Sequence, residues 1–456
     1  MSYEILQPSS HYNDETIFTI PSRAQCLIDP DFSLNDIGFY VSTMPAIAAS
    51  VSYPVTSGIA ACIDSIEILD NDQTLEYIQD VADRAAINSM QMTNQDAMNI
   101  YSRTQRVRNS YKIENGKICY KDSGVPTTLT AATSTTPTGS LALNQYSGVL
   151  SAMTAAAPRA LILSKYHTIE IRIRWNTKVG DALSKFVVQG AGVITANSAA
   201  LQTIQLAPVR PCLVYKVYKE KELVKQYEEI YAKGLTLQFE TWESESNSLP
   251  KATAAGATST YEYRLRSIPG RFVTRAICQN KYIYNSAVNY DAAAGVAMGL
   301  VAWNAYAGTV GNQYSTPMLN ESMNIDLNNA IFIDGGVPLP AIKAYHRRLA
   351  LGSQLQLVTN TDIKKDDADE IKTMQNAVIG AHKVQSYYGF WINKPVFDMK
   401  VSYTKTHSQA LDFLGTHDGN QGLPLDQIWR WEFVRYLQIK NAVVQIFDSD
   451  PNKQKK

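Results

Sequence analysis

Histidine and cysteine supply many of the metal ligands and nucleophiles of proteins, and in this chain both residue types are scattered. No two of them stand at a spacing typical of a zinc site or a redox pair. The sequence contains no HExxH, GxSxG, GxxxxGK[ST] or GxGxxG motif. We therefore predict no enzyme, and no catalytic, cofactor-binding or metal-binding residues. The histidines are His11, His167, His346, His382, His407 and His417, and the cysteines are Cys26, Cys62, Cys119, Cys212 and Cys278.

Acidic residues offer two further patterns that could do chemistry. Asp70-Asn71-Asp72 begins like a calcium-binding loop, but Leu75 stands where that loop requires glycine. We interpret this motif, and the charge run from Lys364 to Glu370, as acidic residues at the start of helices. Carboxylates distant in sequence could still meet in a groove, as in glycosidases. A carbohydrate-binding or carbohydrate-cleaving β-sandwich, marked by clustered acids and aromatic rings, therefore stays open as the alternative function.

Composition limits the partners of the chain. Lysine plus arginine and aspartate plus glutamate number 42 each, so the formal net charge is zero. This balance gives no general attraction to nucleic acid and no long-range repulsion between copies. We predict no specific nucleic-acid binding, because the three lysines of the tail, Lys453, Lys455 and Lys456, provide only weak attraction. The first ten residues lack a basic segment, so we expect no signal peptide and synthesis in the cytosol.

Alternating apolar and polar residues predict strands in both halves of the chain. In Ile169–Trp175 the alternation is unbroken, which gives one buried and one wet face and is typical of antiparallel sheets. The segments 261–266, 323–327 and 397–403 repeat this pattern. Further strands are expected at 17–28, 63–69, 213–218, 235–239 and 429–439. The sequence therefore predicts an all-β protein with sheets that are wet on one side.

Helices are expected to be few and to lie between strands. Leu75, Ile78, Ala82 and Ala85 share one helical face. A second helix is predicted over 219–233, ended by Gly234. Two more are expected around 340–349 and 371–378. Because these helices do not alternate regularly with the strands, βαβ winding is excluded.

Two long segments are nearly free of charge. Ser123–Pro158 has no charged residue, and Tyr282–Asn320 has only Asp291. Each precedes a strongly alternating strand, so the two halves have a similar layout. With 456 residues, the chain is long enough for two domains. We predict an N-terminal arm at 1–15, a first domain at 16–234, a second domain at 235–447 and a C-terminal tail at 448–456.

A series of strands and turns follows one order through most of the chain, from about Thr16 to Phe447. The segments are Pro158–Leu163, Tyr166–Ile173, Leu213–Tyr218, Leu235–Glu240, Ile268–Val273, Ile325–Asn329, Pro338–Pro340, Phe397–Tyr403 and Trp429–Val444. Together they resemble the major capsid proteins of virophages and Polinton-like viruses. This resemblance implies two tandem eight-stranded antiparallel jelly-roll sandwiches, with a few short helices in the connecting loops.

The resemblance also implies a function. Such chains form homotrimers of pseudo-hexameric outline that tile an icosahedral viral shell, and they use no cofactor. The expected location is the virion, and the expected partners are the chain itself, neighbouring capsomers, and minor capsid, penton or cement proteins. The two low-charge segments would be tower or intersubunit loops. A scaffold that shapes a viral membrane without staying in the virion is a related alternative, and contact with an inner membrane is left open.

Overall fold

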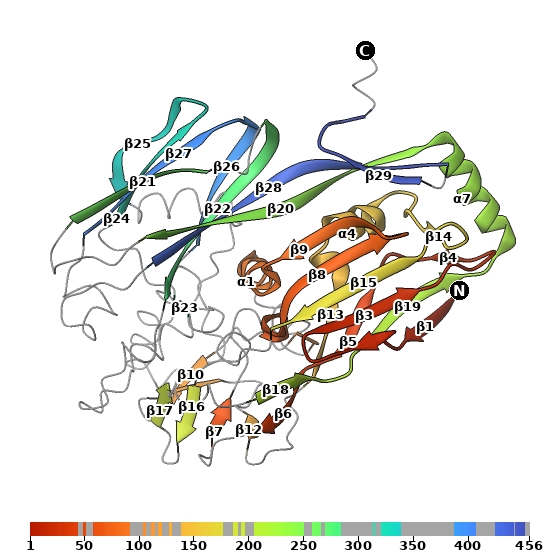
Figure 1. The fold of residues 1–456 in the computed structure, drawn as a ribbon, viewed down its shortest axis with the longest axis horizontal. Coiled ribbons are helices and arrows are strands. Elements are labelled where there is room, and N and C mark those ends of the chain that lie inside the picture. Colours follow the sequence, from red (N-terminus) through yellow and green to blue (C-terminus); the bar gives the residue numbers. More distant parts are fainter. Residues whose placement is uncertain are drawn as a thin grey trace, which may run out of the picture.

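The computed structural model describes the chain in stretches separated by gaps. The described residues are 1–43, 49–51, 58–91, 104–105, 111–114, 117–120, 127–129, 138–176, 186–189, 193–196, 205–249, 258–265, 270–283, 313–314, 321–338, 387–406, 425–441 and 443–451. They form mainly antiparallel sheets, arranged as two units side by side (Figure 1). The prediction of an all-β protein with antiparallel sheets is confirmed.

The first unit is a sandwich of two sheets around an apolar core. One sheet contains β1 (Ser2–Leu6), β19 (Cys212–Tyr218), β4 (Leu27–Ile28), β5 (Ser33–Ile37), β14 (Ile162–Leu163) and β13 (Gly139–Ala142). The other has the order β2 (Ser10–His11), β3 (Glu15–Ile20), β15 (Ile169–Trp175), β8 (Ile63–Asp70) and β9 (Gln73–Gln79). The chain thus passes back and forth between the two sheets, mostly two strands at a time, as in a jelly roll.

Small two-stranded sheets extend the first unit at one end. They lie along the lower edge of Figure 1, whereas α7 and β29 lie at the opposite edge. The pairs are β6 (Phe39–Thr43) with β18 (Gln205–Pro208), β7 (Ala49–Val51) with β12 (Thr127–Leu129), β10 (Tyr111–Glu114) with β11 (Lys117–Tyr120), and β16 (Phe186–Gln189) with β17 (Val193–Ala196).

The second unit is also built from two sheets. The larger contains β20 (Leu235–Leu249), β28 (Leu425–Lys440), β22 (Arg271–Ile283) and β26 (Tyr387–Val396), with the short strands β23 (Gln313–Tyr314) and β29 (Val443–Phe447). The smaller has the order β21 (Thr258–Leu265), β27 (Met399–Thr406), β24 (Glu321–Leu327) and β25 (Ala330–Pro338). The predicted tandem of antiparallel sandwiches is confirmed.

Alternation in the sequence produces the buried faces of both sandwiches. In β15 the isoleucines Ile169, Ile171 and Ile173 are at most 3% exposed, while Glu170 and Arg172 between them are partly exposed on the opposite face. In β28, Trp429 and Trp431 are fully buried and stack with ring centroids 5.7 Å apart. Because neighbouring residues of a strand point to opposite faces, these rows fix the register of each sheet.

The helices occupy connections between strands. In the described part of the chain they are η1 (Gly58–Cys62), α1 (Val81–Gln91), η3 (Leu143–Gln145), α4 (Gly148–Ala155) and α7 (Lys221–Lys233). The helix predicted before Gly234 is confirmed as α7, and Gly234 adopts φ = 90° at its C-terminus. The phenols of Tyr227 and Tyr231 donate to the backbone oxygens of Arg159 and Leu161, which fixes α7 to the first sandwich.

The predicted helix face containing Leu75 and Ile78 is wrong in its first half. Both residues belong to strand β9, and the helix begins only at Val81. Asn71 and Asp72, which we interpreted as a helix start, adopt positive φ values of 48° and 64° and form the tight turn between β8 and β9. Asparagine and aspartate tolerate this left-handed conformation, so the motif encodes a hairpin turn.

Several predicted features fall partly or wholly outside the described residues. The helices expected at 340–349 and 371–378 lie there, as does most of Tyr282–Asn320. The end of the other low-charge segment is described, and it contains η3 and α4. The two helices and the roles of the two low-charge segments therefore stay predictions, and so do the domain boundaries.

The two longest strands cross from one unit to the other. Strand β20 pairs with β28 from Leu235 opposite Ile439 to Leu249 opposite Leu425. At one end of this ribbon Phe239, Leu437 and Ile439 join the core of the first sandwich. At the other end Trp429 and Trp431 are buried in the second. One continuous ribbon therefore contributes to both cores, and Figure 1 shows β20 and β28 running from one unit into the other.

We predict that Gly148→Ala destabilises the protein by about 1–3 kcal/mol, the usual cost of overpacking. A Cβ at Gly148 would lie 1.9 Å from the backbone oxygen of Glu240, so α4 would be pushed away from β20. Denaturant unfolding measures the change, with Ser151→Ala on the exposed surface of α4 as the control. Equal stability of the two variants would contradict this close contact.

Candidate functional site

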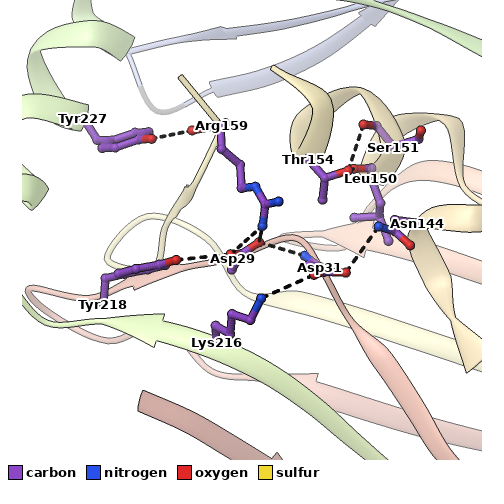
Figure 2. Close-up of polar contacts among 10 residues, drawn as sticks. All are labelled: Asp29, Asp31, Asn144, Leu150, Ser151, Thr154, Arg159, Lys216, Tyr218 and Tyr227. Atoms are coloured by element: carbon purple, nitrogen blue, oxygen red, sulfur yellow. Dashed lines mark hydrogen bonds and ion pairs between the residues drawn. The ribbon is translucent and has the colours of Figure 1, made fainter. Parts of the chain in front are cut away.

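A polar cluster around Asp29 lies on the first sandwich (Figure 2). The Asp29 side chain is completely buried. It accepts hydrogen bonds from Arg159 Nη1 at 2.9 Å, from the backbone NH of Asp31 at 3.1 Å and from the Tyr218 hydroxyl at 3.4 Å. The bond to Asp29 raises the pKa of Arg159, and burial raises the pKa of Tyr218. The Arg159 guanidinium therefore stays charged and the Tyr218 hydroxyl stays protonated, so both can donate hydrogen bonds to the Asp29 carboxylate.

A second carboxylate extends the cluster. Asp31 lies 3.5 Å from the ammonium of Lys216 and accepts from Asn144 Nδ2 at 3.3 Å. Tyr227 of α7 donates to the backbone of Arg159 (Figure 2). The cluster thus joins the turn between β4 and β5, strand β19, helix α7 and the segment after α4. Each carboxylate is neutralised by a cation of its own. We therefore interpret this cluster, called the Asp29 latch below, as a structural link between these elements.

A second set of charges lies between the two units. Arg430 of β28 is 1% exposed, and its guanidinium donates to Asp83 of α1 at 2.5 Å. Asp80 lies 3.5 Å from the same guanidinium. Glu432 of β28 accepts from Arg275 Nη2 at 2.7 Å and from the indole NH of Trp242 at 2.6 Å. These residues form the inter-unit seam.

Another buried carboxylate of the inter-unit seam lies at the start of α4. Glu76 of β9 accepts hydrogen bonds from the Ser147 hydroxyl at 2.5 Å and from the backbone NH groups of Gly148 and Val149 at 3.1 Å. Thr241 of β20 lies at 3.4 Å from the same carboxylate. A negative group at a helix N-terminus is stabilised by the helix dipole and by the otherwise unpaired NH groups. Glu76 therefore fastens β9, α4 and β20 together.

Arg84 of α1 differs from the other arginines of the seam. It is 6% exposed, donates through Nη1 to the backbone oxygen of Tyr146, and lies over the Trp242 ring at 5.0 Å. Its Nε and Nη2 atoms have no hydrogen-bond partner. Burial lowers the pKa of this guanidinium, and the charge of Glu76 counteracts that effect.

A cavity of about 530 Å³ opens beside this arginine. Its lining comes from α1, the η3–α4 segment and the ribbon of the second unit. The polar and aromatic lining residues include Arg84, Asn88, Asn144, Gln145, Ser151, Gln238, Glu240, Trp242, Arg275 and Glu432. The volume is in the range of small-molecule sites. The cavity brings together residues that lie more than 300 positions apart, so sequence spacing gave no indication of it.

The histidines and cysteines do not converge within the part of the chain that the structure describes. His167 is buried and pairs with Asp70 at 2.7 Å, and His11 contacts Thr16 at 2.8 Å. The other four histidines lie outside the described residues. Cys26, Cys62 and Cys278 are buried, and Cys212 is half-buried. Among the described residues no three histidine, cysteine or acidic side chains form a group that could hold a metal ion.

The alternative function requires clustered acids and aromatic rings, and the cavity contains some of them. Glu432, however, is already paired with Arg275 and Trp242. Glu240 is then the remaining acid among the described lining residues, and one carboxylate does not make the pair that glycoside cleavage requires. Trp242 also has the guanidinium of Arg275 5.6 Å from its ring, besides that of Arg84. The described part of the cavity therefore gives little support to carbohydrate cleavage.

The two antiparallel sandwiches, joined by one helix and one shared ribbon, define the double jelly-roll fold. Solved structures of viruses and of a viral capsid protein align with this chain over nearly its full length. A chain of the Sputnik virophage aligns with a TM-score of 0.58 at 12% identity, over 99% of this chain and 89% of that one. The mavirus major capsid protein aligns with a TM-score of 0.57 at 10% identity, over 99% and 91%.

A third structure of the same kind is the capsid of the virus PBCV-1, with a TM-score of 0.51 at 12% identity over 98% of this chain and 96% of that chain. No family model and no curated protein matches this sequence. The likeness therefore concerns the fold, which confirms the double jelly roll expected from the sequence. In the described residues no helix is long and apolar enough to cross a membrane.

We predict that Arg430→Met destabilises the protein by about 3–5 kcal/mol, because the buried carboxylate of Asp83 loses its ion-pair partner. The matched control is Arg435→Met on the same strand, whose partner Asp448 is half-exposed. That variant is expected to lose at most about 1 kcal/mol. Denaturant unfolding measures the stability of both variants. Similar losses of stability would show that the Arg430–Asp83 pair contributes no more than an exposed ion pair.

The seam also predicts a pH dependence. Partial loss of hydration beside the cavity, reinforced by the charge of Glu432, raises the pKa of Glu240 above its ordinary value of 4.5. The folded state therefore binds this proton more tightly than the unfolded chain does, so Glu240 favours folding in acid and opposes it as the pH rises through its folded pKa. Glu240→Gln should raise the melting temperature at neutral pH relative to wild type, and the gain should vanish in acid. The exposed Glu262→Gln is the control; a pH-independent gain would refute the assignment.

Proposed function

We propose that this chain is the major capsid protein of an icosahedral virus and that it acts as a structural tile, not as an enzyme. The observation that supports this most is the full-length likeness to viral capsid chains, which extends over both sandwiches and their connection. The described polar clusters are consistent with it, since their carboxylates are engaged in ion pairs and helix capping. The location that follows is the virion shell.

The proposed unit of assembly is a homotrimer of pseudo-hexameric outline, because each chain supplies two similar sandwiches and three chains supply six. Neighbouring capsomers are the next partners, and minor capsid, penton or cement proteins would complete the shell. A net charge of zero removes long-range repulsion between copies. Within the chain, the proposed domains are 16–234 and 235–447, with an arm before and a tail after them.

The mass of the purified protein in solution, combined with electron microscopy of single particles, tests the proposal. We expect three times the chain mass of 50.6 kDa and particles of hexagonal outline. A monomer at concentrations well above those of a capsid assembly reaction would contradict it. Presence of the protein in mature particles then distinguishes a shell tile from a scaffold that leaves the virion.

The low-charge segment Tyr282–Asn320 provides a sharper prediction. If it lies between subunits, its uncharged and apolar residues lower the cost of removing water from the interface. Replacing 284–312 with a short glycine–serine linker should leave cooperative unfolding intact and abolish the trimer. Sedimentation measures the assembly state, and a trimer that survives the replacement would assign the segment another role. Replacing 130–137 in the first low-charge segment is the matched comparison.

A further inference from the structure

The cavity at the inter-unit seam is lined by a buried arginine, two of whose guanidinium nitrogens have no hydrogen-bond partner, and we infer that it is a binding site for a small oxyanion of the carboxylate or phosphate class. The central residue is Arg84, which lines the cavity and is 6% exposed. This inference concerns a ligand of the folded chain and holds whether or not the chain forms a capsid.

The carboxylates around the cavity have other partners. Glu76 accepts from the start of α4 and from the Ser147 hydroxyl. Glu432 is bound by Arg275 and Trp242, and Asp83 pairs with Arg430. Among the described residues, no carboxylate lies within ion-pair distance of the Arg84 guanidinium. Burial removes water from this guanidinium and no carboxylate replaces it in direct contact, so an anion that binds the two nitrogens without partners would be favoured at this position.

The geometry of the arginine indicates what kind of ion fits. Nη1 is engaged by the backbone oxygen of Tyr146, which leaves Nε and Nη2 without partners. These two nitrogens form one edge of the planar guanidinium, and their NH groups point the same way. Two oxygens of a carboxylate or phosphate match that edge in a bidentate contact. Buried donors without partners are rare in native proteins and commonly mark an unplaced water or ion.

A ligand in the cavity can reach this edge of the Arg84 guanidinium after one side-chain movement. Nε and Nη2 have almost no exposed surface, so the guanidinium must turn toward the cavity to meet a ligand. The turn breaks no ion pair, because Arg84 stacks on Trp242 and bonds only to a backbone oxygen. Arg275, Asn88 and Ser151 line the same space and bring further donors. Water alone would satisfy the hydrogen bonds but would place no negative charge in direct contact with the guanidinium.

The test uses the full chain with inorganic phosphate and, separately, acetate, at constant ionic strength with chloride as the reference anion. Thermal unfolding and calorimetric titration are measured for wild type and for Arg84→Gln. We expect a saturable rise in melting temperature for wild type, since a ligand of the folded state stabilises it. Arg84→Gln should weaken binding about tenfold or more, the usual effect of losing hydrogen bonds to a charged group.

Two further variants keep the outcome decisive. Arg264→Gln removes a 65% exposed arginine and should bind phosphate like wild type, which accounts for the general stabilisation by excluded salts. Ser151→Trp, on the exposed surface of α4, fills the cavity and leaves Arg84 in place, so it should abolish binding even if Arg84→Gln fails to fold. No saturable binding of either anion by wild type, or unchanged binding in Ser151→Trp, overturns the inference. The stronger of the two anions identifies the chemical class.

Discussion

Pairing of β20 with β28 is the interaction on which the arrangement of the two sandwiches depends. Fifteen consecutive residue pairs, from Leu235 to Leu249, make a ribbon of roughly 50 Å at about 3.3 Å per residue. One end of the ribbon packs on the core of the first sandwich, and the other end belongs to the second. Neither unit can rotate against the other without bending this ribbon or exposing apolar residues such as Phe239 and Leu437.

Apolar contact alone does not fix a register or an angle, because it has no direction. The charges of the inter-unit seam have direction, and they fall at the middle of the ribbon. Arg430 meets Asp83, and Glu432 meets Arg275, where the strands pass from one unit to the other. A shift of β28 by one residue would turn these charges into the opposite face and leave them buried without partners. The seam thus penalises alternative arrangements more than it adds to stability.

The sequence predicted those parts of the fold that depend on local pattern. Strict alternation identified β15, and the stripe ended by Gly234 identified α7. Prediction failed where a local pattern fitted two structures: Leu75 and Ile78 suit a helical face by spacing, but the Asn71-Asp72 turn made them part of a hairpin. Helix α4 was missed because its segment has no charged residues and so no contrast between two faces. The partners of Arg430 and Arg84 were out of reach, because those contacts depend on how two distant segments meet.

A rigid crossing between the units also limits where a double jelly roll can change. The small sheets β6–β18, β7–β12 and β16–β17 extend from one edge of the first sandwich, away from α7 and β29 (Figure 1). Additions at that edge leave the ribbon, the seam and the Asp29 latch untouched, because none of those elements reaches it. The scaffold can therefore keep two sandwiches at one angle while the surface at this edge varies. Fixed geometry with a variable surface at one edge is compatible with a shared fold at 10% identity to the mavirus major capsid protein.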